Sequence, residues 1–200
     1  MNDRSPEHIR PLLARIDRLM AERERVLVAI DGGSASGKTT LGVLLQSIYA
    51  CPVFHMDDFF LRPEQRTPER FSEPGGNVDR ERFLSEVLLP LREGKTVDYR
   101  RFDCKTFTIA SPRRIEPGRL NIIEGAYAMH PDLAPYYDLT VFLVVSAEKQ
   151  RERILKRNAP AQAELFFDRW IPFEQRYFAA LNVPERCDLT IFLDDQTSVP

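Results

Sequence analysis

A glycine-rich octet near the start of the sequence carries the clearest chemistry. Residues 32–39 read GGSASGKT and match the pattern GxxxxGK[ST]. An apolar run at 26–30 precedes the octet and a helical pattern follows it, which is the context this pattern requires. Glycines let successive backbone N–H groups turn toward one anion, and the following helix N-terminus adds partial positive charge. The octet therefore predicts a site for a nucleoside triphosphate.

The residues of the octet have separate expected roles at that nucleotide. Lys38 would reach the β- and γ-phosphates, and the Thr39 hydroxyl would ligate Mg²⁺. The sequence thus predicts ATP and Mg²⁺ as cofactors. The expected nucleotide-binding residues are Gly32, Gly33, Ser34, Ala35, Ser36, Gly37, Lys38, Thr39 and Thr40. By itself the octet does not separate a kinase from a GTPase or an ATPase motor.

Carboxylates follow two later apolar runs. The segment MDDFF at 56–60 follows a short predicted strand, and Glu124 ends the run LNII at 120–123. In open α/β sheets, chemistry collects at the carboxyl ends of strands. Asp57 is the predicted general base for a substrate hydroxyl, with Asp58 as a turn cap or a partner of metal-bound water. Thr39, Asp57 and Glu124 are the predicted metal residues.

A basic helix is expected over 147–157. Arg153 and Arg157 are spaced i and i+4, so they project from one face. Phosphoryl transfer needs cations over the migrating group, and both arginines are therefore predicted to act in catalysis from a lid at 147–170. The alternative is a solvated face that pairs with nearby glutamates. Arg169, beside Trp170, is a further arginine candidate.

Composition limits the other classes of function. The chain has 200 residues, 28 Lys and Arg against 30 Asp and Glu, and 43% hydrophobic residues. This charge balance opposes broad binding to nucleic acid or to an anionic membrane. Three scattered cysteines, a charged N-terminus and the lack of any apolar run near 18 residues favour a cytoplasmic protein. A homo-oligomer is left open.

Periodicity predicts one domain over 1–200 with alternating strands and helices. An N-terminal helix is expected over 1–25, with Ser5 as N-cap and Pro6 at the first helical position. The expected strands are 26–30, 53–56, 120–123, 139–145 and 188–193. The other expected helices are 39–49, 79–92, 147–157 and 161–181, with distortions at Pro90 and Pro172. Residues 57–118 read as an acceptor-site insertion with short antiparallel pieces.

The resulting fold class is α/β, with a five-stranded parallel sheet between two helical layers and a small β-containing insertion. Together with the glycine-rich octet, this pattern predicts a P-loop NTPase fold in three layers, α/β/α. The chain resembles the uridine kinase and phosphoribulokinase-like branch of P-loop kinases over about 26–193. The resemblance rests on GGSASGKTT at 32–40, MDDFF at 56–60, IIEGAYA at 122–128 and RERILKR at 151–157.

The resemblance implies an ATP-dependent kinase that phosphorylates a hydroxyl of a nucleoside-like small molecule, most similar to uridine kinase. It implies that Asp57 is the base, that Asp79 contacts the ribose and that the segment 99–103 lines the acceptor pocket. The implied acceptor-binding residues are Asp57, Phe59, Asp79, Tyr99, Arg101 and Arg169. Pantothenate kinase and nicotinamide riboside kinase share this architecture and stay open as alternatives.

Two other classes of function are weighed against the kinase. A P-loop GTPase needs Asn-Lys-x-Asp and Asp-x-x-Gly, and neither pattern occurs in the sequence. The other class is an ATP-binding switch protein without kinase activity. It would bind nucleotide but release no ADP.

Overall fold

The computed structural model describes residues 7–193, so the predicted cap residues Ser5 and Pro6 lie outside the described range. Short 3₁₀ and π-helical turns carry the label η. The strands are β1 Val26–Gly32, β2 Val53–His55, β3 Val97–Tyr99, β4 Phe102–Asp103, β5 Thr108–Ile109, β6 Arg113–Ile115, β7 Leu120–Glu124, β8 Leu139–Val144 and β9 Leu189–Phe192. The helices are α1 Arg10–Glu22, α2 Lys38–Tyr49, α3 Pro68–Ser72, α4 Arg80–Phe83, α5 Leu89–Glu93, α6 Ala147–Arg157, α7 Pro160–Leu165, α8 Ile171–Leu181 and α9 Val183–Arg186. The turns are η1 Glu7–Ile9, η2 Met56–Phe59, η3 Pro63–Gln65, η4 Leu84–Leu88, η5 Ala134–Tyr136 and η6 Phe166–Trp170.

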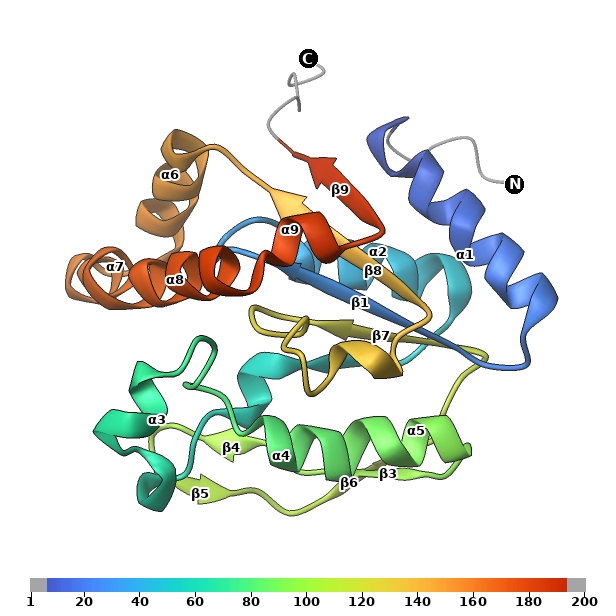
Figure 1. Cartoon of the computed structure of the whole chain (residues 1–200), viewed down its shortest axis with the longest axis horizontal. Coiled ribbons are helices and arrows are strands. Elements are labelled where there is room, and N and C mark those ends of the chain that lie inside the picture. Colours follow the sequence, from blue (N-terminus) through green and yellow to red (C-terminus); the bar gives the residue numbers. More distant parts are fainter. Residues whose placement is uncertain (1–6, 194–200) are drawn as a thin grey trace.

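The central sheet has five strands in the order β2-β7-β1-β8-β9, and every neighbouring pair is parallel (Figure 1). β1 lies in the middle, where Val28 pairs with Ile122 of β7 and with Leu139 of β8. Parallel strands need helical crossovers, which bury both faces of the sheet. The expected α/β class with a five-stranded parallel sheet is thereby confirmed.

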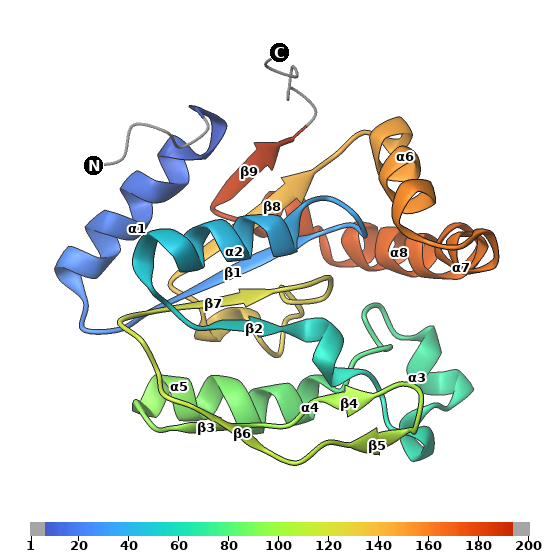
Figure 2. The same ribbon diagram turned by 180° about the vertical axis from the view of Figure 1, so that it is seen from behind.

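Two apolar cores flank the sheet, and successive residues of β1 alternate between them. Val28 and Ile30 face a core that α1 and α2 cover, whereas Leu27 and Ala29 face the opposite core (Figures 1 and 2). The second core takes side chains from the helical segment 80–93, the turns after β7, α8 and α9. Burial on both faces explains why the strands read as continuous apolar runs.

The first strand is longer than its apolar run indicates. The sequence pattern ended the strand at Ile30, yet β1 continues through Asp31 and Gly32. These two residues pair with Phe142 and Leu143 of β8, so the ladder extends the strand beyond its apolar part. The longer strand places the glycine-rich loop directly at the carboxyl edge of the sheet.

The insertion contains two antiparallel ribbons, β3 with β6 and β4 with β5, which lie beyond the β2 edge of the sheet (Figure 2). The helix expected at 79–92 is interrupted by the π-helical turn η4 directly before Pro90. The π turn η6 likewise precedes Pro172. Proline lacks an N–H group, so it cannot donate the regular bond to the carbonyl four residues earlier. Both distortions therefore fall in the turn before the proline.

Across residues 7–193, every helix falls short of the length and apolarity that a membrane crossing requires.

A buried carboxylate joins three parts of this architecture just before β8. The side chain of Asp138 is 2% exposed, accepts the Leu27 N–H of β1 at 2.8 Å and receives two N–H groups of Arg92. Arg23, which follows α1, also pairs with it. Removing this carboxylate would leave the Leu27 N–H without its acceptor and would free two arginines that are 52% and 32% exposed.

We therefore expect Asp138→Ala to lower the free energy of unfolding by about 2 kcal/mol. Urea denaturation monitored by circular dichroism measures this loss. Asp98→Ala is the matched control, because Asp98 and Arg114 form an exposed pair at 3.9 Å that should contribute less than about 1 kcal/mol. Equal losses in the two variants would contradict a structural role for Asp138.

Candidate active site

The glycine-rich loop between β1 and α2 has the shape of an anion cradle. Gly32 and Gly37 have φ values of +147° and +105°, and Ala35 also has positive φ at 57°. A Cβ on Gly32 would lie 2.6 Å from the Leu143 carbonyl oxygen, so only glycine fits there. Among the described residues, the buried Ser36 hydroxyl has no hydrogen-bond partner. These features fit the phosphates of a nucleotide.

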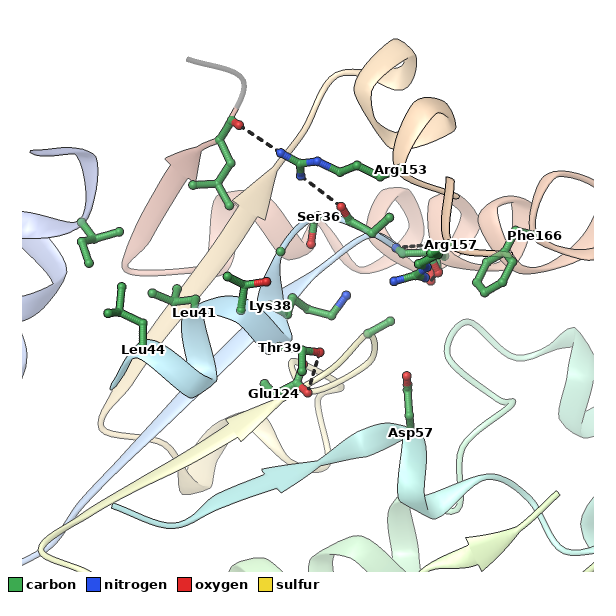
Figure 3. A pocket seen from close by; sticks show the side chains of 18 of the residues that line it. Ser36, Lys38, Thr39, Leu41, Leu44, Asp57, Glu124, Arg153, Arg157 and Phe166 are labelled. Carbon is green, nitrogen blue, oxygen red and sulfur yellow. Dashed lines mark hydrogen bonds between the residues drawn. The ribbon is translucent and has the colours of Figure 1, made fainter. Parts of the chain in front are cut away.

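A cavity of about 530 Å³ opens above this loop (Figure 3). Of the predicted site residues, it brings together Ser34, Ala35, Ser36, Gly37, Lys38, Thr39, Thr40, Asp57, Glu124, Arg153 and Arg157. Gly32 and Gly33 lie at the base of the loop. The cavity is also lined by Leu44, Leu193 and two residues of η1, His8 and Ile9. The N-terminal segment thus both packs on the sheet and reaches the cavity.

The loop lysine points back onto its own backbone. Lys38 Nζ donates to the carbonyl oxygens of Gly32 and Gly33, at 2.8 and 2.9 Å. Arg153 in α6 donates to the Ala35 carbonyl oxygen at 3.1 Å. The guanidinium of Arg157 lies 5.4 Å from the Phe166 ring centroid. All three cations line the cavity above the loop.

Thr39 and Glu124 meet at the carboxyl edge of the sheet. The Thr39 hydroxyl donates to Glu124 Oε1 at 3.1 Å, and the His55 Nδ1 lies 2.5 Å from the same oxygen. The hydrogen bond between His55 and Glu124 is the largest influence on the pKa of His55, and it raises that pKa. A hydroxyl and a carboxylate beside a phosphate cradle are oxygen ligands of the kind that Mg²⁺ takes. The donor set fits the metal, and His55 is a neighbour that sequence patterns did not single out.

The adjacent carboxylates Asp57 and Asp58 have different surroundings. Asp57 points into the cavity toward Lys38 (Figure 3). Asp57 is exposed to the open cavity, yet the protein around the cavity displaces part of its water and raises its pKa, while Lys38 opposes the shift. Asp58 instead accepts the Tyr99 hydroxyl at 2.7 Å and Arg101 Nε at 2.8 Å. Asp58 is therefore held by two partners, whereas Asp57 faces open space.

The residues predicted to bind the acceptor fall into separate places. Tyr99 and Arg101 line a second cavity, of about 490 Å³, together with Asp57. Arg169 lines another cavity, of about 210 Å³, among aromatic side chains. Phe59 is fully buried, with its ring 4.9 Å from that of Phe83. Asp79 is buried and caps α4, and its carboxylate pairs with Arg62 at 3.1 Å. Neither Phe59 nor Asp79 reaches the cavities that Asp57 lines.

Comparison with known proteins agrees with this geometry. Residues 27–161 match the model of the phosphoribulokinase/uridine kinase family. The chain belongs to this family. Uridine kinase of Chloroflexus aurantiacus is 28% identical over 143 residues, which cover 66% of this chain and 68% of the relative. Uridine kinase-like protein 4 of Arabidopsis thaliana is 28% identical over 146 residues, 68% of this chain. The match spans only 31% of that Arabidopsis protein.

Two solved structures of similar fold are described as candidate kinases. A candidate fructose transport system kinase from Silicibacter sp. TM1040 superposes with a TM-score of 0.70 at 24% identity, covering 93% of this chain and 99% of that one. A possible uridine kinase from Bacillus stearothermophilus gives a TM-score of 0.64 at 23% identity, with 90% and 99% coverage. At these identities the likeness shows the P-loop kinase fold alone.

Two buried acids contact the loop, and the sequence patterns predicted neither contact. Glu174 in α8 accepts the Ser34 N–H at 2.8 Å and the Ser34 hydroxyl at 2.6 Å. Asp31, at the end of β1, accepts the Gly32 N–H at 2.7 Å and, on its other oxygen, the Tyr177 hydroxyl at 2.9 Å. Glu174 lies 140 residues from its partner, so no local spacing could reveal it. The direct contact of Asp31 with the loop backbone is equally invisible to periodicity.

Burial raises the pKa of Asp31 to about 6 from an ordinary value of 3.8. We expect its side-chain carboxyl ¹³C resonance to titrate near pH 6, with Asp31→Asn used to assign the signal. Because the pKa is raised in the folded state, the stability linked to its proton is fully present below pH 3.8 and is lost as the pH rises through about 6. A titration midpoint near 4 would contradict the buried environment.

Proposed function

We propose that the protein is an ATP- and Mg²⁺-dependent kinase that transfers the γ-phosphoryl group to a hydroxyl of a nucleoside-like small molecule. The observation that supports this most directly is the position of Asp57. Its carboxylate faces the cavity that the loop residues Lys38 and Thr39 line, while Asp58 beside it is occupied by other side chains. A carboxylate so placed can accept the proton of an attacking hydroxyl.

In this proposal three cations neutralise the charge of the transferring phosphoryl group. Lys38 exchanges the two loop carbonyls that it now contacts for phosphate oxygens, and Arg153 and Arg157 neutralise developing charge from the lid. Mg²⁺, when bound, offsets charge on the phosphate oxygens. Thr39 and Glu124 would hold it, with Asp57 nearby.

The shape of the main cavity supports one orientation of the nucleotide. Asp57 lies toward the insertion, where transfer would occur, so the side of the cavity near Leu44, away from Asp57, would hold the base (Figure 3). We propose that the region 147–170 closes as a lid and keeps water from the γ-phosphate. The insertion 57–118 would supply the acceptor side, where Tyr99 and Arg101 line the second cavity with Asp57.

The acceptor is inferred to be nucleoside-like from the resemblance to uridine kinases. Relatives differ in the substrate that their names give: a bifunctional alpha-galactosidase/sucrose kinase of Mediterraneibacter gnavus is 30% identical over 174 residues, 76% of this chain but 18% of that protein. Kinases of other alcohols, of the pantothenate or nicotinamide riboside type, are therefore the alternative within the same chemistry.

The proposal is tested by ADP release from Mg·ATP across a panel of nucleosides, vitamins and sugar phosphates. Release with uridine or cytidine supports a nucleoside kinase. Release with another alcohol keeps the kinase chemistry but changes the acceptor. No release with any acceptor, together with measured ATP binding, would indicate the non-catalytic switch protein instead.

We expect Asp57→Asn to lower kcat by about 10²-fold or more with little change in ATP affinity, because it removes the proton acceptor and leaves the loop intact. Steady-state kinetics and calorimetric ATP binding measure the two effects. Asp58→Asn is the adjacent comparison: it disturbs the pair with Arg101, so it should lower thermal stability more than kcat. If Asp58→Asn proves to be the variant that abolishes turnover, the base is misassigned.

A further inference from the structure

In this structure a carboxylate of the protein accepts a hydrogen bond from a backbone N–H of the phosphate loop. Glu174 in α8 is 5% exposed, and it accepts both the backbone N–H and the hydroxyl of Ser34. Gln150 of α6 donates to the Ser34 carbonyl oxygen at 2.8 Å. The polar groups of Ser34 are thus held from the two helices that begin and follow the lid region. The N–H that Glu174 accepts belongs to the loop built to bind phosphate.

Glu174 lies in the cavity beside the loop that would hold the phosphates. It lines the same cavity as Lys38 and Asp57. Both of these charges act on it: Lys38 favours its ionised form and Asp57 disfavours it, and burial raises its pKa. A carboxylate bonded to the loop residue Ser34, in the cavity that Lys38 and Asp57 also line, lies where the phosphates of a nucleotide would bind rather than its base.

Two anions cannot share this donor. An N–H group bonded to a carboxylate is not available to a phosphate oxygen, and like charges at close range repel strongly in a site with little water. The loop cation is also engaged within the protein, since Lys38 Nζ contacts the Gly32 and Gly33 carbonyl oxygens. In this structure Ser34 and Lys38 are both bonded to groups of the protein itself.

We propose that Glu174 is a specificity-determining residue that the γ-phosphate of a nucleoside triphosphate must displace from Ser34. The inference rests on the proposed nucleotide site and adds that the site distinguishes a nucleoside triphosphate from a diphosphate. A diphosphate has no γ-phosphate, so it binds with Glu174 still on Ser34, whereas a triphosphate competes with that carboxylate. Displacement moves a side chain of α8, which follows directly on the lid region, and links γ-phosphate binding to lid position.

A support role for the loop makes the opposite prediction. If Glu174 only holds Ser34 in the shape that all nucleotides need, its removal weakens triphosphate and diphosphate alike. If it competes with the γ-phosphate, its removal favours the triphosphate alone. The ratio of the two dissociation constants therefore separates the roles.

The test is calorimetric binding of Mg·ADP and of the non-hydrolysable triphosphate Mg·AMP-PNP. Glu174→Gln preserves the side-chain shape and removes only the charge. We expect the ratio of the ADP to the AMP-PNP dissociation constant to rise about tenfold in this variant. Glu164→Gln removes an exposed charge from α7 in the lid region and should leave the ratio unchanged. An unchanged ratio in Glu174→Gln, or an equal loss of both affinities, would overturn the proposal.

A second variant covers the case in which Glu174→Gln does not fold. Ser34→Ala keeps the contested N–H and removes the hydroxyl that Glu174 also accepts. The carboxylate is then held less firmly, so the ratio should shift in the same direction by a smaller factor, and a shift toward ADP would contradict competition. If the wild-type protein binds neither nucleotide, the proposed function fails, whereas binding with an unaltered ratio rejects only the role of Glu174.

Discussion

The phosphate loop exposes more backbone N–H groups than its own backbone can bond, and the surrounding structure depends on how they are satisfied. Such donors are costly to bury without partners. Here Asp31 accepts the Gly32 N–H and Glu174 accepts the Ser34 N–H. Each acid is buried and each has a raised pKa because of that burial. The fold holds negative charge against the loop at a cost, and phosphate is the ligand that can take over part of that role.

Parallel pairing places the remaining chemistry beside this loop. β1 lies between β7 and β8, so the carboxyl ends of adjacent strands meet at one edge. Glu124 reaches the Thr39 hydroxyl there, and η2 carries Asp57 into the same cavity. The neighbours of each carboxylate differ. Asp58 is paired with Arg101, Asp79 caps a helix, and Asp57 faces the cavity. A general base needs a carboxylate that is not already bonded to other side chains, which is why Asp57 is the proposed base.

Local patterns predicted the loop, the five parallel strands and the group formed by Lys38, Asp57 and Glu124, because each depends on short-range periodicity or on motif context. They could not predict contacts set by tertiary packing. Glu174 meets Ser34 only through the fold of α8, and β1 extends past Ile30 only because β8 pairs with it. The segments around Phe59 and Asp79 were assigned through resemblance. A motif match gives a position in the chain, and packing decides whether the side chain faces a cavity.

The central claim is that a hydroxyl activated by Asp57 accepts the γ-phosphoryl group held by this loop. Transfer of label from [γ-³²P]ATP into a small molecule tests it most directly, with Lys38→Ala measured in parallel. We expect label in a phosphomonoester with the wild-type protein and none with Lys38→Ala. Label that appears only in inorganic phosphate, or equal transfer by Lys38→Ala, would contradict it.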